Sequence, residues 1–339
     1  AVQVRHEVAP GETVDEIAAR YDVSAQQLIE DHDLNPDQHP KPGTILTFHA
    51  VDPPLPRLRL DYVVEPGDTW TILAGRFDVS IEHLQGANRD LAGKLTVGAQ
   101  IHVWVDPQIE PRRDEVVQVA FPVKPGGRSI GAPSQGRLEG GIQLPPSPNY
   151  YYRVNPTYQF GASHTLQHLQ EAIARFRQLY RYRGVLVLSD LSRDGGGPLP
   201  PHKSHQSGRD IDIWLPALQG TYLPKHIQQD SKPTSDQVNW YAAWGLVESL
   251  LSTGQVKYIF LDRSLHATLY SAADRMGADR DLLAEIQSQP DDSDPALAAR
   301  ARYRGTIRHA DHHVRHIHVR FKCPAGDTQC VDKPVTEEP

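Results

Sequence analysis

The sequence predicts an α+β protein, in which two small βααβ units precede a larger domain with a central antiparallel sheet flanked by helices. Three observations predict this architecture. The first 105 residues contain one pattern twice, two later segments alternate apolar and polar residues as strands do, and amphipathic helical stretches accompany those segments. A length of 339 residues suits two or three domains, and we expect domains over residues 4–49, 60–105 and 117–331.

The internal repeat begins with matching turns, because residues 6–14 and 62–70 both carry Pro-Gly, an acidic residue and Thr. The match continues through an Asp-Val-Ser junction and ends on a glycine followed by a short apolar run. Each unit therefore predicts a strand, a turn, two capped helices and a second strand. The expected caps are Thr13, Ser24, Thr69 and Ser80.

These two units resemble LysM domains, which are βααβ modules that bind glycans containing N-acetylglucosamine. The resemblance rests on the Pro-Gly-[Glu/Asp]-Thr turn and the Asp-Val-Ser junction. The first unit is the poorer match, since His32 stands where the second has Asn88, and Val14 replaces Trp70. The resemblance implies peptidoglycan as a partner. The alternative is that the repeats are spacers without a ligand.

The larger domain begins after a Pro-rich linker at residues 50–59 and a second junction near 106–116. Its clearest helix should carry one apolar face and end before Gly184. In chain order we expect a helix over residues 163–182, a buried strand over 185–188, a helix over 239–252 and a strand over 256–261.

Two segments of this domain concentrate residues that bind metals. Five of the 17 histidines fall within residues 308–321, and residues 202–212 add two histidines and two aspartates. Both segments alternate, so one face of the later strand carries His316, His318 and Arg320, and one face of the earlier strand carries Asp210 and Asp212. Together they offer two histidines and a carboxylate, and a catalytic zinc normally has three protein ligands and an open position.

The same segments resemble the two metal motifs of the penicillin-insensitive murein endopeptidases, which belong to the lysostaphin, D-Ala-D-Ala and hedgehog-like group of metallopeptidases. Residues 201–213 match the first motif and residues 313–320 the second. The resemblance implies Zn²⁺ as the cofactor, and the implied ligands are His205, Asp212 and His318.

The resemblance also implies roles for histidines that do not bind the metal. His316 would act as a general base or as a donor to the oxyanion, and His202 and His313 would line the site and hold water or substrate. The family pattern has a tryptophan where this chain has Ala310, so local substrate contacts can differ.

Elementary chemistry supports a histidine as the base. A bound zinc lowers the pKa of water to about 7, and a histidine of ordinary pKa, about 6.5, can exchange the proton. The sequence has no His-Glu-x-x-His motif and no Gly-x-Ser-x-Gly elbow, which disfavours a glutamate base and a serine nucleophile. Asp210 could orient a ligand imidazole or be a solvated carboxylate, and His309 and His312 receive no role.

Composition narrows the partners and the compartment. The net charge of −7 gives no basic field for nucleic acid, and no apolar run is long enough for a membrane span. Cys323 and Cys330 favour a short disulfide loop over two free thiols. The start at Ala1 fits a mature form without its signal, or a trimmed chain. We therefore expect a periplasmic or secreted protein associated with the cell wall.

The predicted function is zinc-dependent hydrolysis of amide bonds in peptidoglycan crosslinks, with D-alanyl-meso-diaminopimelate as the expected bond and the LysM units as anchors on glycan strands. One alternative is a D,D-carboxypeptidase or a phage-type lysin that uses the same zinc site. Another is a non-catalytic protein that binds the cell wall.

Overall fold

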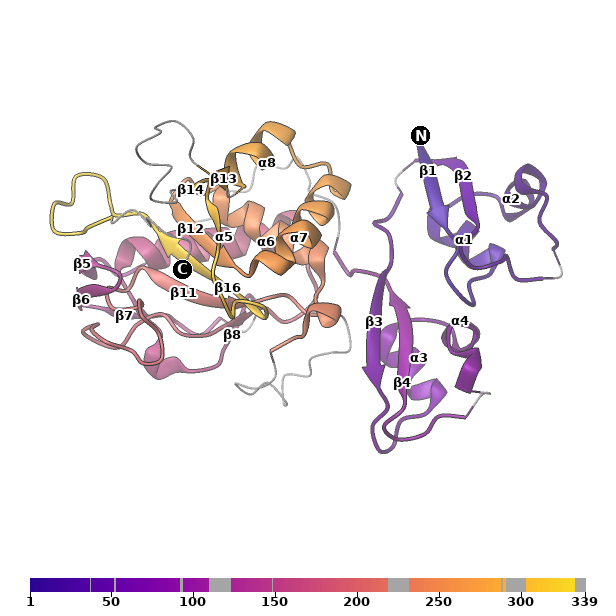
Figure 1. Cartoon of the computed structure of the whole chain (residues 1–339), viewed down its shortest axis with the longest axis horizontal. Coiled ribbons are helices and arrows are strands. Elements are labelled where there is room, and N and C mark those ends of the chain that lie inside the picture. Colours follow the sequence, from indigo (N-terminus) through magenta and orange to yellow (C-terminus); the bar gives the residue numbers. More distant parts are fainter. Residues whose placement is uncertain are drawn as a thin grey trace. The chain divides into compact units, whose positions relative to one another are not determined.

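Each N-terminal repeat folds as a strand, two helices and a returning strand (Figure 1). The first contains β1 (Val2–Glu7), α1 (Val14–Tyr21), α2 (Ala25–His32) and β2 (Ile45–Ala50). The second contains β3 (Leu58–Val63), α3 (Trp70–Phe77), α4 (Ile81–Ala87), the 3-10 helix η1 (Arg89–Leu91) and β4 (Gln100–Val105). In both repeats the two strands pair antiparallel. The predicted βααβ order is confirmed.

The four predicted helix caps all form. The side chains of Thr13, Ser24, Thr69 and Ser80 each accept a hydrogen bond from the backbone N–H three residues further on. Each bond satisfies one of the N–H groups that a helix leaves without a partner in its first turn. The cap residues therefore fix where each helix begins.

This computed structural model describes residues 1–36, 38–51, 53–91, 94–109, 123–147, 149–218, 232–287, 289–290 and 303–332. The chain divides into two compact units, one that contains the repeats and one that contains most of the remaining chain. The domain boundary predicted at residue 117 lies outside the described residues. Within these ranges, no helix is both long and apolar enough to cross a membrane.

The C-terminal unit is built on a six-stranded sheet in the order β15-β12-β16-β11-β10-β8. Its strands are β8 (Tyr152–Arg153), β10 (Val187–Leu188), β11 (Asp210–Trp214), β12 (Val256–Leu261), β15 (Ile307–His309) and β16 (His316–Phe321). The inner pairs are antiparallel, whereas β8 with β10 and β12 with β15 are parallel. The prediction of an antiparallel sheet is therefore wrong at both edges.

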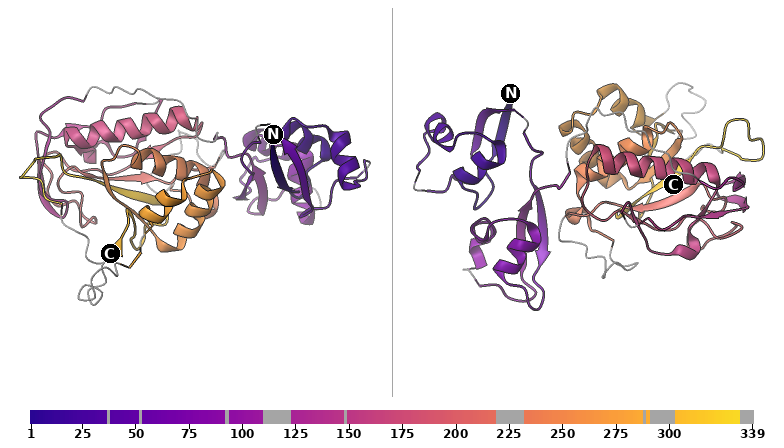
Figure 2. Two further views of the ribbon diagram at one scale, coloured as in Figure 1. Left: turned by 90° about the horizontal axis from the view of Figure 1, so that it is seen from above. Right: turned by 180° about the vertical axis from the view of Figure 1, so that it is seen from behind.

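Parallel pairing at the edges follows from the connections. A parallel partner needs a crossover, which is usually helical. The helix α5 (Ser163–Leu179) lies between β8 and β10 in the chain, and α7 (Arg263–Arg275) and α8 (Arg280–Ile286) lie between β12 and β15. In the views of Figure 2, α5 runs alongside the strands. That helices flank the whole central sheet stays a prediction.

The predicted helix over residues 163–182 is α5, which ends three residues earlier, and the helix over residues 239–252 is α6 (Trp240–Leu251). The apolar face of α5 is buried at Leu166, Leu169, Ile173 and Phe176. Helix α5 packs on α6, and α6 packs on α7. The remaining elements are β5 (Arg128–Ala132), β6 (Gln135–Glu139), β7 (Ile142–Gln143), η2 (Pro156–Tyr158), β9 (Phe160–Gly161), η5 (Ser235–Gln237), β13 (Gln289–Pro290) and β14 (Tyr303–Arg304).

The predicted disulfide between Cys323 and Cys330 is formed. Arg209, which is 1 % exposed, binds the chain on both sides of this disulfide. The Arg209 guanidinium donates to the carbonyl oxygens of Phe321 and Val331 and to the carboxylate of Asp332, at 3.0, 2.8 and 2.5 Å. Arg209 directly precedes β11, so the disulfide region and the segment with the metal motif are tied together.

Candidate metal centre and active site

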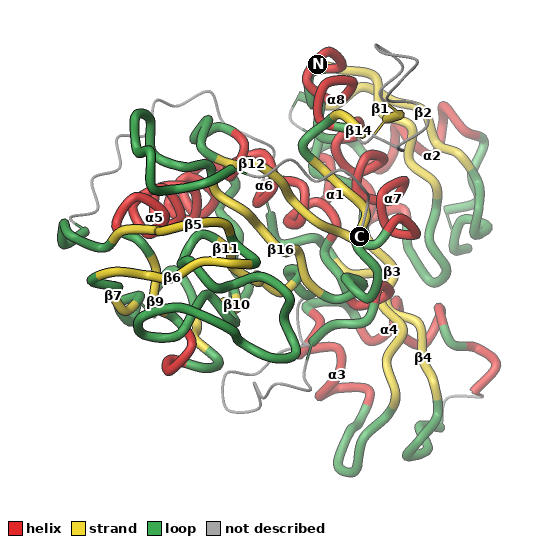
Figure 3. Tube along the Cα trace, turned by 60° about the vertical axis from the view of Figure 1, so that its left-hand side comes forward, coloured by secondary structure: helices red, strands yellow, loops and turns green. Residues whose placement is uncertain are grey.

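The two metal motifs meet in the middle of the sheet, where β11 and β16 lie side by side (Figure 3). Their antiparallel register places Asp212 opposite His318, and Asp210 opposite Arg320. Directly opposed side chains on one face of such a pair have Cβ atoms about 4.5–5.5 Å apart. Two segments about a hundred residues apart in sequence therefore present their side chains to one point.

His205 reaches this point from the loop before β11. Its backbone is in the left-handed region, with φ of 64°, which is uncommon for a residue other than glycine. Its N–H donates to Asp210 Oδ2 at 3.1 Å, and its Nδ1 lies 2.8 Å from the Leu191 carbonyl oxygen. Because Nδ1 donates to that carbonyl, Nε2 carries the lone pair of the neutral ring. The ring is fully buried with Nε2 facing Asp212 and His318.

Three ligand atoms converge at nearly equal distances. His205 Nε2 lies 3.2 Å from His318 Nδ1 and 3.4 Å from Asp212 Oδ1, and His318 Nδ1 lies 3.3 Å from Asp212 Oδ1. Around a four-coordinate zinc with ligand distances of about 2.0–2.2 Å, neighbouring ligand atoms stand about 3.3–3.5 Å apart. Asp212 Oδ1 is also buried without a hydrogen-bond partner. The residues therefore fit a tetrahedral divalent cation.

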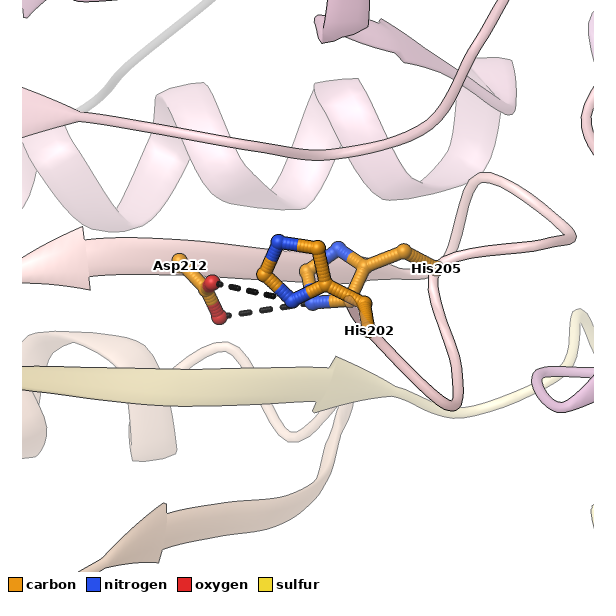
Figure 4. A group of neighbouring side chains, drawn as sticks. All are labelled: His202, His205 and Asp212. Carbon is orange, nitrogen blue, oxygen red and sulfur yellow. Dashed lines mark ion pairs between the residues drawn. The ribbon is translucent and has the colours of Figure 1, made fainter. Parts of the chain in front are cut away.

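His202 lies beside His205, with the two ring centroids 4.5 Å apart, and faces the other oxygen of the Asp212 carboxylate (Figure 4). Its Nδ1 is 3.7 Å from Asp212 Oδ2, and His202, His205 and Asp212 offer ligand atoms that all lie within 4.8 Å of one another. A cation could thus be held by His202 in place of His318. The set with His318 is tighter, and His202 Nε2 is already engaged 3.1 Å from Asp190 Oδ2. We therefore favour the set with His318.

The other two predicted histidines also reach the site. His316 Nε2 is 3.7 Å from Asp212 Oδ2, and the His313 and His316 rings lie 4.7 Å apart. Burial lowers the pKa of His316 to about 3, against the opposing charge of Asp212. Burial also lowers the pKa of His313. Both rings are therefore neutral at physiological pH, which is the state in which an imidazole accepts a proton.

The carboxylates beneath the histidines stay ionised although they are buried. Burial raises the pKa of Asp210, but Arg320 and His318 outweigh it and hold that pKa well below the usual range. The histidines that face Asp212 likewise outweigh burial and hold its pKa well below the usual range. Burial lowers the pKa of His318, yet Asp210 and Asp212 together raise it to about 9. A cation that binds His318 Nδ1 would therefore displace a proton.

A cleft of about 640 Å³ opens above these groups. Its walls contain the predicted residues His202, His313, His316 and His318. Ala310, which stands where the resemblance leads us to expect a tryptophan, also lines the cleft. The further lining residues are Ser134, Pro201, Lys203, Ser204, Phe260, Asp311, His312 and Arg320.

Two side chains at this site had no predicted role. Asp190 is 6 % exposed, pairs with His202, and raises the pKa of that histidine against the effect of burial. It lies in a loop after β10, where no periodic pattern marks it. Arg320 was placed correctly by alternation with His316 and His318, but its place on the cleft wall needed the structure.

His309 lies outside the proposed ligand set and forms a group with Asp262 and Asp311, whose ligand atoms lie within 4.8 Å of one another. His309 Nδ1 accepts a hydrogen bond from the Arg263 N–H at 3.0 Å, and Nε2 lies 3.1 Å from Asp311 Oδ1. A neutral ring that accepts at Nδ1 carries its proton on Nε2. That proton occupies the atom that would face a metal, so this group is better explained as a hydrogen-bonded cluster.

Comparison with known proteins assigns a family to each part of the chain. Residues 129–338 match the family model described as penicillin-insensitive murein endopeptidase, and residues 6–48 and 62–104 match the LysM domain. Penicillin-insensitive murein endopeptidases of Yersinia pestis and Escherichia coli are 29 % and 24 % identical to this chain over 236 and 230 residues. Each alignment covers 64 % of this chain and 74 % of the relative.

Among solved structures, the spore cortex-lytic enzyme SleL of Bacillus cereus matches with 20 % identity and a TM-score of 0.15. The match covers 39 % of this chain and 25 % of that one, so the chain spans about a quarter of the length of that structure. The family model, by contrast, matches more than half of the chain. The chain belongs to the penicillin-insensitive murein endopeptidase family and carries two LysM domains.

Proposed function

We propose that this protein is a zinc-dependent peptidoglycan hydrolase that cleaves the D-alanyl-meso-diaminopimelate amide of peptide crosslinks. The proposal rests on one observation above all. Two histidine nitrogens and one carboxylate oxygen lie 3.2–3.4 Å from each other, below a cleft lined by further histidines. Membership of a murein endopeptidase family supplies the substrate class.

In this proposal His205, Asp212 and His318 hold the zinc ion. When bound, zinc makes water nucleophilic near neutral pH and polarises the scissile carbonyl. His316, whose Nε2 lies 3.7 Å from Asp212 Oδ2, takes the proton of the attacking water. His202 and His313 line the same cleft and orient water or substrate. Asp210 fixes the far side of the His318 ring, since its Oδ1 lies 3.1 Å from Nε2.

The domain organisation gives the enzyme its location on the wall. We propose LysM domains over residues 4–49 and 60–105 and a catalytic domain over residues 117–331. Binding to glycan strands raises the effective concentration of crosslinks near the cleft. The Cys323–Cys330 disulfide suits an oxidising compartment, which supports a periplasmic or secreted protein.

Mass spectrometry of muropeptides before and after digestion tests this function. We expect crosslinked dimers to become monomers, EDTA to stop the reaction, and a β-lactam to leave it unchanged because no acyl-serine forms. Trimming of terminal D-Ala from uncrosslinked muropeptides would instead identify a carboxypeptidase. Zinc bound in a stoichiometric amount without any turnover of purified sacculi would identify a wall-binding protein.

A further inference from the structure

Arg320 stands at the end of the row of metal-site residues on β16, and its guanidinium is held on two sides. Nε donates to Asp210 Oδ1 at 2.7 Å, and the guanidinium carbon lies 5.4 Å from the centroid of the Phe260 ring. The ion pair and the ring fix the plane of the group. Arg320 therefore has a defined orientation on the cleft wall before any substrate arrives.

The two Nη atoms of Arg320 are the part of this group left for a ligand. Among the residues that the structure describes, only Nε has a protein acceptor, and the Asp210 oxygens are already taken up. Oδ1 lies beside Arg320 and His318, and Oδ2 accepts from the His205 N–H. Arg320 is 14 % exposed at its side chain and lines the cleft. A planar pair of N–H donors directed at a cleft suits a carboxylate.

The position of Arg320 relates such a carboxylate to the scissile bond. Asp210 Oδ1 lies 3.1 Å from His318 Nε2 and 2.7 Å from Arg320 Nε, so one carboxylate oxygen separates the guanidinium from a proposed metal ligand. Successive residues on one strand face are about 6.6–6.8 Å apart. A group bound to Arg320 would therefore belong to the residue next to the reacting amide.

The charges of the cleft wall also favour a bound carboxylate. Among the described residues that line the cleft, Lys203 and Arg320 are the lysine and the arginine, and the acidic residue, Asp311, lies 3.1 Å from His309 Nε2. In the proposed substrate, the diaminopimelate carbon that carries the scissile amide nitrogen also carries a free carboxylate. The substrate thus carries a carboxylate next to the scissile amide, and the cleft wall carries the two Nη donors of Arg320 next to a proposed metal ligand.

We propose that Arg320 binds the carboxylate on the leaving-amine side of the scissile amide and so selects crosslinks in which that carboxylate is free. This inference rests on the proposed function. It makes Arg320 a specificity residue, because a carboxamide at the same position accepts fewer hydrogen bonds and carries no charge.

The test uses the full chain loaded with zinc and two synthetic crosslinked stem-peptide dimers, one with this carboxylate free and one with it converted to a carboxamide. The wild type should cleave the free acid with a kcat/KM about 10- to 100-fold higher. Arg320→Gln should bring the ratio close to one through loss on the free acid alone. Calorimetry with the free-acid and carboxamide forms of the amine product should show the same change in binding.

Lys203→Gln is the matched control, since it removes the other cation of the wall, and it should keep the wild-type ratio. Zinc content is measured for every variant because Arg320 also contacts Asp210. If the Gln variant loses zinc, Arg320→Lys decides, and it should lower the ratio at least threefold with zinc retained.

An unchanged ratio in an Arg320 variant that holds its zinc, or a ratio lost in Lys203→Gln instead, would overturn the inference. Failure of the proposed function is a different result. In that case the zinc-loaded wild type would cleave neither dimer.

Discussion

Asp212 shows at the scale of one residue what the fold does for this site. Its carboxylate is 1 % exposed, remains ionised, and keeps Oδ1 without a hydrogen-bond partner. A buried charge with an open coordination position costs free energy unless a counter-charge compensates it. His318, whose pKa Asp210 and Asp212 raise to about 9, supplies part of that compensation, and a divalent cation would supply the remainder.

Substitutions should separate the histidines that hold the metal from the one that moves a proton. His205→Ala or His318→Ala removes a ligand and should abolish both zinc binding and hydrolysis. His316→Ala should retain zinc and lower kcat by about 10²- to 10⁴-fold, as for a general acid–base residue. Zinc content by plasma mass spectrometry and turnover of soluble dimers check both. A fully active His316→Ala enzyme would refute its role as base.

Asp190 should affect turnover through its contact with His202. Asp190→Asn keeps the shape of the side chain but removes the charge that lies 3.1 Å from His202 Nε2. We expect zinc to be retained and kcat/KM to fall by about 10- to 100-fold, which is typical for partners behind an active-site histidine. Asp194→Asn, at an exposed acid in the same loop, is the control and should behave as wild type. Equal effects of the two substitutions would argue against a specific role for Asp190.

At the scale of elements, alternation predicted β11 and β16 and the faces of their side chains, because the two-residue period of a strand is visible in sequence. The edge strands β8 and β15 span only two or three residues, so they carry no periodic signal of their own, whereas the apolar run at residues 185–188 predicted a strand at β10. Their parallel pairing depends on helical crossovers elsewhere in the chain. That is why the edges of the sheet could not be predicted while its centre could.

The turn between β1 and α1 is stabilised by a buried carboxylate. Glu12 is fully buried, and its oxygens contact His6 Nε2 at 2.7 Å, the Ala9 N–H at 3.0 Å and an Arg57 Nη at 2.6 Å. Burial raises the pKa of Glu12, but His6, Ala9 and Arg57 together hold it below its usual value of 4.5. The ionised form is thus the one that the folded state favours.

This carboxylate predicts a pH-dependent stability. Because the folded pKa is lowered, the contribution of Glu12 is complete above pH 4.5 and is lost as the pH falls through the folded pKa. Glu12→Gln should lower the opening free energy of α1 by about 1–3 kcal/mol near neutral pH. Hydrogen exchange of α1 amides measures it. A difference between wild type and variant that persists undiminished to pH 3 would contradict this role.

At the scale of the whole molecule, the repeats and the catalytic unit should contribute separately. Deletion of residues 1–105 should weaken binding to purified sacculi and leave cleavage of small soluble dimers unchanged, because the cleft lies within residues 134–320. Sedimentation with sacculi and turnover of dimers measure the two properties. Loss of dimer cleavage in a folded truncated enzyme would show that the repeats take part in catalysis.

The sequence predicts part of the candidate site, and the remainder depends on the folded structure. The two metal motifs predict six site side chains, from His202 to His318, and the structure brings them together around one point. The sequence could not show that Asp190 stands behind His202 or that Arg320 faces the cleft, because both depend on the register of β11 and β16 and on a loop without periodicity. The resemblance implies His318 as the third ligand, and the distances favour it over His202.

That choice defines the most direct measurement, a crystal structure of the zinc-loaded protein with anomalous data at the zinc edge. We predict one zinc ion bound by His205 Nε2, Asp212 Oδ1 and His318 Nδ1 at about 2.0–2.2 Å, with the fourth position open to solvent. A zinc ion held by His202 in place of His318, or located away from Asp212, would contradict the account.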